Sequence, residues 1–304
     1  MVEQRPEIRQ YEEILRQLRS KLRALPVEMK EKKELKKNIA GSSNGRTAPS
    51  GGVYLGSSPS PAANEFMKLI SLNTWGGRIH EPLVQFLQTH QADTDFFCFQ
   101  EVDDNPPEPL RDNADARQNL FSELKTILSE HVGYFAPQIP GSGIATFVRK
   151  TINVASSNFS IVLSTEEMTE KFIPRILQHI SIQQPVLSIY NFHGVPKSEK
   201  LDTPERNLQT DRILEILSHD TNPKILVGDF NLRPNTDNVH AFERNMRNLV
   251  IERGFRTTRS RLYNQLATQP FADYSFVSPD ISVKDFQVLT DEISDHLPLF
   301  TEFQ

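Results

Sequence analysis

Carboxylate, amide and histidine side chains stand beside several apolar segments of this sequence, where a buried strand would begin or end. The polar residues and their apolar neighbours are Asn73 after 69–72, Glu101 after 96–99, Asn191 and His193 after 187–190, Asp229 and Asn231 after 225–227, and Asp295 and His296 before 297–303. Burying so many polar groups is unfavourable unless they bind one another or a ligand. Carboxylates can hold a hard metal ion and histidines can transfer protons, so the pattern predicts one convergent site.

The elements that would carry these residues are mostly strands. Strand-like apolar runs lie at 68–73, 95–102, 144–149, 172–182, 186–193, 224–229, 273–278, 284–289 and 298–303, and helix-like segments lie near 80–90, 114–131, 204–219 and 239–252. The helix at 204–219 has a clear start, because Thr203 can cap it and Pro204 suits the first helical position. Strands outnumber helices without strict alternation, which favours a mixed α/β sandwich over a doubly wound parallel sheet.

The first 66 residues differ in character from the rest. Residues 8–25 have apolar positions at three- and four-residue steps, which predicts an amphipathic, charged helical segment within 1–39. This segment would stay solvated, self-associate weakly or contact nucleic acid as an arm. Residues 40–66 are rich in Gly, Ser and Pro, which predicts a flexible linker. A catalytic domain is then expected over 67–304.

The linker has a second interpretation. The segment GSSP at 56–59 is the translation of GGT-TCG-AGT-CCC, which resembles the T-arm of a transfer RNA gene. The reading frame would then run through such a gene, and the functional protein would start at Met67, which opens the first clear strand. A genomic sequence without a transfer RNA gene under codons 41–63 would refute this hypothesis.

Charge is unevenly distributed along the chain. Residues 1–66 hold 12 Lys and Arg against 8 Asp and Glu, whereas 67–304 hold 22 against 31, a net charge of −9. An acidic domain does not bind long nucleic acid through its overall field. A phosphate-bearing ligand would therefore need a local basic patch, a metal ion or both.

The single cysteine, Cys98, excludes an intrachain disulfide and fits a reducing cytoplasm. Because Cys98 lies inside an apolar run, we expect it in the core and not as a nucleophile. No run approaches the roughly 20 apolar residues of a membrane span, and the N-terminus lacks the apolar core of a signal peptide. These features predict a cytoplasmic protein without a membrane span, and we expect a monomer.

Five short motifs occur in a fixed order along the chain. They are LNTW at 72–75, FQEV at 99–102, GDFN at 228–231, ADYSFVS at 272–278 and SDH at 294–296. Together they resemble the signatures of the endonuclease/exonuclease/phosphatase superfamily, over residues 67–304. The resemblance implies the DNase I-like fold, in which two mixed β-sheets pack as a sandwich flanked by helices. Each motif alone is weak, and the ordered set is specific.

The resemblance also implies a divalent metal site, with Mg²⁺ as the expected ion and Mn²⁺ as its substitute. Glu101 is the expected principal ligand, with Asn73 and Asp295 beside it. Mg²⁺ prefers oxygen ligands and keeps several waters, so one or two protein carboxylates suffice. A surface glutamate at a strand end is the alternative reading of Glu101, and a turn-forming residue is that of Asn73.

Catalytic roles follow from the same resemblance. Asp229 would align or deprotonate the attacking water, and His296 would contact the scissile phosphate and transfer a proton. Asp273 would orient His296 and raise its pKa, and His193 would be a phosphate ligand or general acid. The further substrate contacts expected are Asn231, Asn191 and Arg206. An Asx turn is the alternative reading of the GDFN segment.

The implied activity is Mg²⁺-dependent hydrolysis of a phosphodiester by attack of water. An endonuclease or exonuclease acting on nucleic acid is the first expectation, by analogy with the family. A phosphodiesterase or phosphatase for a lipid head group or a small phosphorylated molecule is the second. A catalytically inactive binding module is the alternative from another class.

Overall fold

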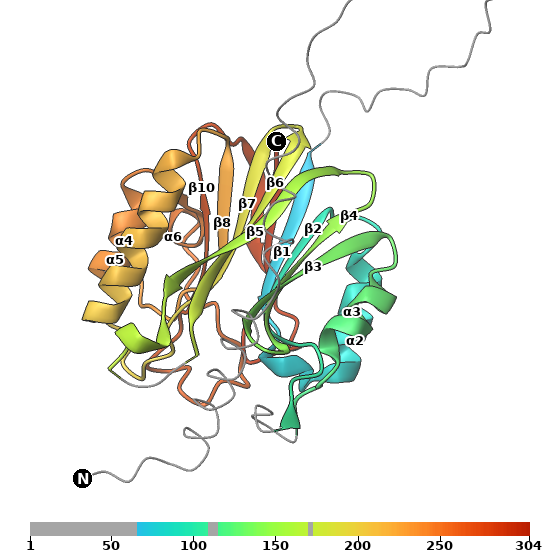
Figure 1. Cartoon of the computed structure of the whole chain (residues 1–304), viewed down its shortest axis with the longest axis horizontal. Coiled ribbons are helices and arrows are strands. Elements are labelled where there is room, and N and C mark those ends of the chain that lie inside the picture. Colours follow the sequence, from blue (N-terminus) through green and yellow to red (C-terminus); the bar gives the residue numbers. More distant parts are fainter. Residues whose placement is uncertain (1–65, 109–114, 170–172) are drawn as a thin grey trace, which may run out of the picture. The chain divides into compact units, whose positions relative to one another are not determined.

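The computed structural model describes residues 66–108, 115–169 and 173–304. Two predicted segments lie outside these ranges: the helical segment within 1–39, and the linker over 40–66 except for its last residue. The hypothesis of a later start concerns the same residues and also lies outside the described part of the chain. The described chain forms two β-sheets that lie face to face (Figure 1).

The first sheet brings together the beginning and the end of the described chain. Its strands are β1 (Met67–Asn73), β2 (Phe96–Asp103), β3 (His131–Ile139), β4 (Ser142–Arg149), β11 (Val283–Val288) and β12 (Leu299–Phe303), in the order β11-β12-β1-β2-β4-β3. β1 runs parallel to β2, with Asn73 beside Gln100, and antiparallel to β12. Parallel pairing places the carboxyl ends of β1 and β2 at the same edge of this sheet.

The second sheet has a similar plan. Its strands are β5 (Asn153–Leu163), β6 (Arg175–Gln184), β7 (Leu187–His193), β8 (Lys224–Asp229), β9 (Arg247–Asn248) and β10 (Asp273–Val277), in the order β5-β6-β7-β8-β10-β9. β7 runs parallel to β8, which pairs His193 with Asp229. β10 runs antiparallel to β8, which pairs Asp273 with Asp229.

Helices flank the two sheets on their outer sides (Figure 1). α2 (His80–His90) and α3 (Leu120–Ile127) lie beside the first sheet, whereas α4 (Pro204–His219), α5 (Asp237–Glu243) and α6 (Leu249–Glu252) lie beside the second. α4 begins as predicted, because the Thr203 side chain accepts a hydrogen bond from the backbone N–H of Arg206. Among the described helices, none combines the length and apolar character of a membrane span.

The side chains of β2 alternate between two apolar layers, one on each face of the first sheet. Phe96 and Cys98 belong to the apolar cluster that fills the sandwich, whereas Phe97 and Phe99 belong to the cluster packed against α2 and α3. Successive side chains of a strand point to opposite faces, so this strand is buried on both sides. Cys98 is therefore a core residue, as predicted. The predicted fold class, two mixed sheets packed as a sandwich with flanking helices, is confirmed.

Some elements differ from the sequence-based prediction. β3 was not expected, because Gly133 and Pro137 interrupt its apolar pattern. It forms at the edge of the first sheet, where a strand tolerates a proline because its missing N–H is not needed for pairing. β5, an edge strand of the second sheet, was not expected either, because its sequence is largely polar and its side chains are mostly exposed. The single helix predicted at 239–252 is two short helices separated by β9, whose two residues pair with β10 instead.

Candidate active site

The polar residues at the strand ends converge where the two sheets present neighbouring edges. The side chains brought together there are Asn73 from β1, Glu101 from β2, His193 from β7, Asp229 from β8, Asp273 from β10 and Asp295 and His296 from the segment before β12. The Ser294 hydroxyl anchors that last segment to β1, since it donates to the carbonyl of Asn73 at 2.7 Å. It also accepts from the backbone N–H of His296 at 3.2 Å. The convergence predicted from the sequence is therefore present.

A break in the β2–β4 ladder aims Glu101 into this site. The register shifts between Phe99 and Val102, and Glu101 has a positive φ of 56°. Bulges redirect side chains near active sites, and a positive φ in a residue other than glycine is strained. The Glu101 side chain keeps 40% exposure, whereas its neighbours in the site are nearly all buried. It is therefore the carboxylate that a ligand from solvent reaches first.

Asn73 links two carboxylates. Its Nδ2 donates to Oε1 of Glu101 and to Oδ2 of Asp229, both at 3.0 Å, while its Oδ1 accepts from the backbone N–H of Trp75 at 3.0 Å. The amide thus turns its nitrogen, not its oxygen, toward the carboxylates. Its predicted role as an oxygen ligand of the metal stays a prediction, and its observed contacts position Glu101 and Asp229.

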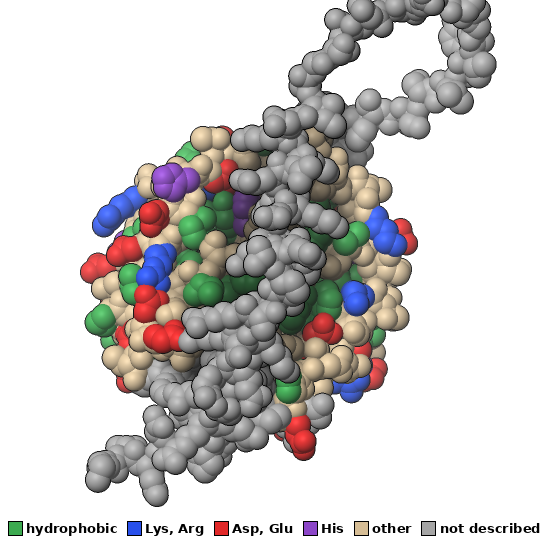
Figure 2. Space-filling view, viewed as in Figure 1, with side chains coloured by type: hydrophobic (Ala, Val, Ile, Leu, Met, Phe, Trp, Pro, Cys, Tyr) green, Lys and Arg blue, Asp and Glu red, His purple; other side chains and the backbone are tan. Residues whose placement is uncertain are grey.

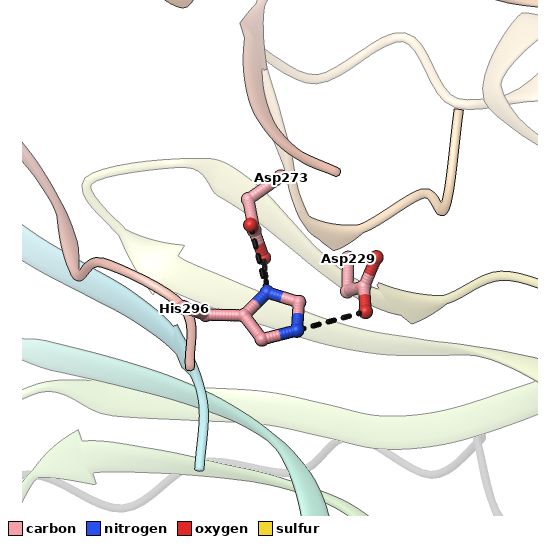
Figure 3. A group of neighbouring side chains, drawn as sticks. All are labelled: Asp229, Asp273 and His296. Atoms are coloured by element: carbon pink, nitrogen blue, oxygen red, sulfur yellow. Dashed lines mark hydrogen bonds and ion pairs between the residues drawn. The ribbon is translucent and has the colours of Figure 1, made fainter. Parts of the chain in front are cut away.

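The imidazole of His296 lies between two aspartates (Figure 3). Its Nδ1 is 2.8 Å from both carboxylate oxygens of Asp273, and its Nε2 is 3.5 Å from Oδ2 of Asp229. Burial lowers the pKa of His296, as does the Arg259 charge, but Asp273, Asp229 and Asp295 outweigh them and raise it above its usual value. The three aspartates thus favour the imidazolium form of His296.

Asp229 is ionised despite its burial. Burial alone would raise its pKa, but the charges of His296, Arg259 and Lys200 hold it well below its usual range. Its Oδ1 also accepts from the backbone N–H of Asn231 at 2.8 Å. A carboxylate of such low pKa is a weak base, so Asp229 is better suited to orienting a water than to removing its proton.

His193 is neutral near pH 7. Burial lowers its pKa to about 3, and the Arg175 charge acts in the same direction. Its Nε2 lies 3.8 Å from Oε1 of Glu101 and 3.7 Å from Oδ2 of Asp229. His193 therefore belongs to the site as a neutral hydrogen-bonding group, without the charge that would suit a general acid.

Lys200 reaches the site from the segment between β7 and α4, and sequence reasoning missed it. Its Nζ donates to Oδ1 of Asn231, whose Nδ2 donates to the carbonyl of Gly194 at 3.3 Å. The Lys200 side chain is buried, which lowers its pKa to about 8. No motif or apolar strand marks this lysine in the sequence, so only the course of the segment reveals it.

Arg259 is a second residue that the sequence did not indicate. It lies between α6 and β10, and its Nη1 is 3.0 Å from Oδ2 of Asp295 and 2.5 Å from Nε2 of His296. Asp295, predicted as a metal ligand, is therefore engaged in an ion pair with this arginine. Its Oδ1 remains 3.8 Å from Nε2 of His296.

Two predicted substrate contacts have other partners. Asn191 is buried between the sheets, where its Nδ2 donates to the carbonyls of Phe99 and Ala145 and its Oδ1 accepts from Gln100 at 2.7 Å. Arg206 is also fully buried, and its guanidinium donates to the backbone carbonyls of the segment that leads into α4. Both side chains are occupied in supporting the site's framework, and their direct contact with substrate stays a prediction.

Replacing Arg206 by methionine is expected to destabilise the protein. Three carbonyls, of Val195, Lys197 and Leu201, would lose a charged donor in a buried place, which costs about 3 kcal/mol in free energy of unfolding. Chemical denaturation measures this loss. The matched control is Arg244→Met, which changes an exposed side chain and should cost about 0.5 kcal/mol or less. Equal stability of the two variants would contradict the supporting role.

Two groups of side chains are candidates for holding a metal. Donor atoms of Asp229, Asp273 and His296 all lie within 4.8 Å of one another. However, Nδ1 of His296 is already bound to Asp273, and a guanidinium nitrogen lies 2.5 Å from its Nε2, so an added cation there would meet a positive charge. This group fits a hydrogen-bonded acid–base pair better than a metal site.

The second group, centred on Glu101, fits a hard divalent cation. Although the Glu101 side chain is 40% exposed, the surrounding protein partly desolvates its carboxylate and raises its pKa, and the negative charges of Asp295 and Asp229 raise it further. A divalent cation would relieve this crowding of carboxylates, and oxygen ligands are those that Mg²⁺ prefers. Glu101 with Asp229 is therefore the better candidate metal centre.

Comparisons with known proteins agree with this architecture. A mannosyl-6-phosphatase from Bacteroides thetaiotaomicron is 19% identical, with a TM-score of 0.63 over 78% of this chain and 99% of that chain. The human Nocturnin catalytic domain with bound sulfate is 18% identical, with a TM-score of 0.55 over 79% and 93%. An endonuclease/exonuclease/phosphatase from Bacteroides vulgatus is 18% identical, with a TM-score of 0.58 over 79% and 99%. At these identities the likeness concerns the fold.

The sequence itself carries the family relationship. None of the curated proteins compared matches it. The model of the Endonuclease/Exonuclease/phosphatase family matches residues 70–296, which include every strand-end residue of the site from Asn73 to His296. On this match, and with the fold in agreement, the chain belongs to the endonuclease/exonuclease/phosphatase family.

Proposed function

We propose that this protein hydrolyses phosphodiesters by attack of water, with Mg²⁺ as its metal ion. The observation that supports this best is the juxtaposition of the His296–Asp273 pair, the ionised Asp229 and the partly exposed Glu101 in one buried site. Phosphoryl transfer needs an aligned nucleophile and stabilisation of charge on the phosphoryl oxygens. These side chains supply both functions.

The protein's own groups would act as follows. The Asp229 carboxylate accepts a hydrogen bond from the attacking water and orients it, while Asn73 holds that carboxylate in place at 3.0 Å. The protonated His296 donates from Nε2 to a phosphoryl oxygen, and Asp273 keeps the ring oriented through Nδ1. The neutral His193 offers a further hydrogen bond without adding charge. Manganese is the expected substitute for magnesium.

Glu101 would hold the metal ion, with Asp229 next to it. A bound divalent cation supplies Lewis-acid stabilisation of the negative charge on the phosphoryl group. Asn73 holds the two carboxylates near each other, because its Nδ2 donates to Oε1 of Glu101 and to Oδ2 of Asp229, each at 3.0 Å. This arrangement supports Glu101 as the residue on which metal affinity depends.

A small phosphorylated molecule is the second substrate class, and surface charge favours it over an extended nucleic acid. Residues 67–304 carry a net charge of −9. On the face drawn in Figure 2, the basic side chains of the described residues lie singly among acidic ones. Nucleic-acid binding depends on basic surface that neutralises successive phosphates. If the protein is a nuclease, it would therefore bind its substrate mainly through the buried cations of the site.

The test is hydrolysis of bis-p-nitrophenyl phosphate, p-nitrophenyl phosphate and single-stranded DNA by the full chain. We expect turnover of the diester in MgCl₂, loss of turnover in EDTA and recovery when Mg²⁺ is restored. Asp229→Asn should lower kcat at least about 100-fold, because the amide cannot orient the water as an acceptor with the same charge. Equal rates in the wild-type protein and this variant would end the enzymatic claim for this site. Absence of turnover in both would favour the catalytically inactive binding module.

A further inference from the structure

Arg259 belongs to a segment that is fixed against the SDH motif. Its backbone forms a bridge with His296. On either side, the N–H of Leu297 donates to the carbonyl of Thr258 at 2.9 Å, and the N–H of Ser260 donates to the carbonyl of Asp295 at 3.1 Å. The side chain of Arg259 is only 4% exposed. The arginine therefore has a defined place beside the catalytic histidine, although it comes from a different part of the chain.

Three contacts orient its guanidinium group. Nη1 donates to Oδ2 of Asp295 at 3.0 Å. It also lies 2.5 Å from Nε2 of His296, which can accept from it only while the imidazole is neutral. The guanidinium carbon lies 4.1 Å from the centre of the Tyr263 ring, a cation–π distance. Nε of the arginine is buried and has no hydrogen-bond partner among the described residues. A buried donor without an acceptor is unfavourable, because it has lost its hydrogen bond to water.

A purely structural ion pair does not explain this arrangement. A pair made only for stability would direct the guanidinium at Asp295, and buried pairs contribute little net stability. Here the Nη1 that pairs with Asp295 also faces Nε2 of His296, the atom that would donate to the substrate. An oxyanion at this point can accept from the arginine and from the imidazole together, and phosphate oxygens suit the planar fork of arginine.

We propose that Arg259 is a catalytic residue, which binds a non-bridging oxygen of the phosphoryl group next to His296 and stabilises the charge that develops on it. This inference rests on the proposed phosphoesterase function. It adds to that function an anion-binding group from the segment between α6 and β10, at a position that none of the five sequence motifs contains.

Tyr263 is the corresponding positioning residue. Its ring stacks on Arg259, and its hydroxyl donates to Oε1 of Gln269 at 2.9 Å. Nε2 of Gln269 in turn donates to the carbonyl of Ser198, in the segment that also carries Lys200. One ring contact and two hydrogen bonds thus connect Arg259 with the segment that carries Lys200.

The experiment compares Arg259→Ala with Arg261→Ala. Arg261 lies two residues further on, its side chain is 84% exposed and it pairs with Glu292 at the surface, so it controls for loss of a positive charge from the same segment. Inorganic phosphate binding is measured by isothermal titration calorimetry, with and without MgCl₂. We expect the dissociation constant to rise about 10–100-fold in Arg259→Ala and to stay unchanged in Arg261→Ala.

Turnover provides the second readout. Arg259→Ala should lower kcat about 100-fold on bis-p-nitrophenyl phosphate, and added guanidinium at non-denaturing concentration should restore part of it. Arg259→Lys, which keeps the charge but loses the fork, should weaken phosphate binding about 10-fold and carries the decision if the alanine variant does not fold. Wild-type phosphate affinity in the folded Arg259 variants would overturn the inference. An inactive wild-type protein would overturn the proposed function, while phosphate affinity would still decide the role of Arg259.

Discussion

Replacing His296 by alanine is expected to lower kcat for the diester about 10²–10⁴-fold, the usual contribution of a positioned acid–base group. The ring is almost fully buried, and its two nitrogens face Asp273 and Asp229 at 2.8 and 3.5 Å, so no other described side chain replaces it. Steady-state kinetics on bis-p-nitrophenyl phosphate measures the loss. The control is His219→Ala, at the exposed end of α4, which should retain wild-type kcat.

Asp273→Asn tests whether the charge of Asp273 keeps His296 protonated. The amide keeps the shape of the side chain but removes a charge that raises the pKa of His296, so imidazolium is lost at a lower pH. The alkaline limb of the kcat profile should therefore move to lower pH than in the wild-type protein. Because the two residues act as a unit, the double variant should be little worse than His296→Ala alone. Additive losses, with an unmoved limb, would contradict the proposed pair.

Glu101→Gln is expected to have the second large effect. The substitution keeps the side chain's size and removes the most exposed carboxylate of the site. A metal ion commonly supplies several kcal/mol of transition-state stabilisation, so we expect about a 10³-fold loss of kcat/KM at low Mg²⁺ concentration. Raising the Mg²⁺ concentration should recover part of this loss. Calorimetric titration with MgCl₂ should show weaker binding in the same variant.

The matched control for this substitution is Glu130→Gln, which changes an exposed glutamate in the turn before β3. It should leave both the Mg²⁺ affinity and kcat/KM unchanged. Wild-type Mg²⁺ affinity in Glu101→Gln would place the metal elsewhere. The group of Asp229, Asp273 and His296 would then be the alternative centre.

The sequence was informative where the chemistry lies in short, contiguous motifs. Apolar runs that end in polar residues predicted the central strands β1, β2, β7 and β8 and the convergence of Asn73, Glu101, His193 and Asp229. Such predictions succeed because strand ends in parallel pairs meet at one edge, whatever the rest of the chain does. The mixed sandwich followed from the same strands.

The parts that could not be predicted depend on the course of irregular segments. The positive φ and register break that aim Glu101 are tertiary features without a local signature. Arg259 and Lys200 reach the site from segments whose paths depend on contacts with distant residues. Arg206 carries a charge that suggests a substrate contact, but its burial under backbone carbonyls is visible only in the folded chain.

The hydrogen bond between Ser294 and the carbonyl of Asn73 joins residues 221 positions apart. It accompanies the pairing of β1 with β12, so one wall of the site exists only after the last strand has inserted beside the first. Contacts of such sequence separation form late, because the loop that they close is long. During synthesis on the ribosome, the proposed activity should therefore be absent from the growing polypeptide until β12 has left the exit tunnel.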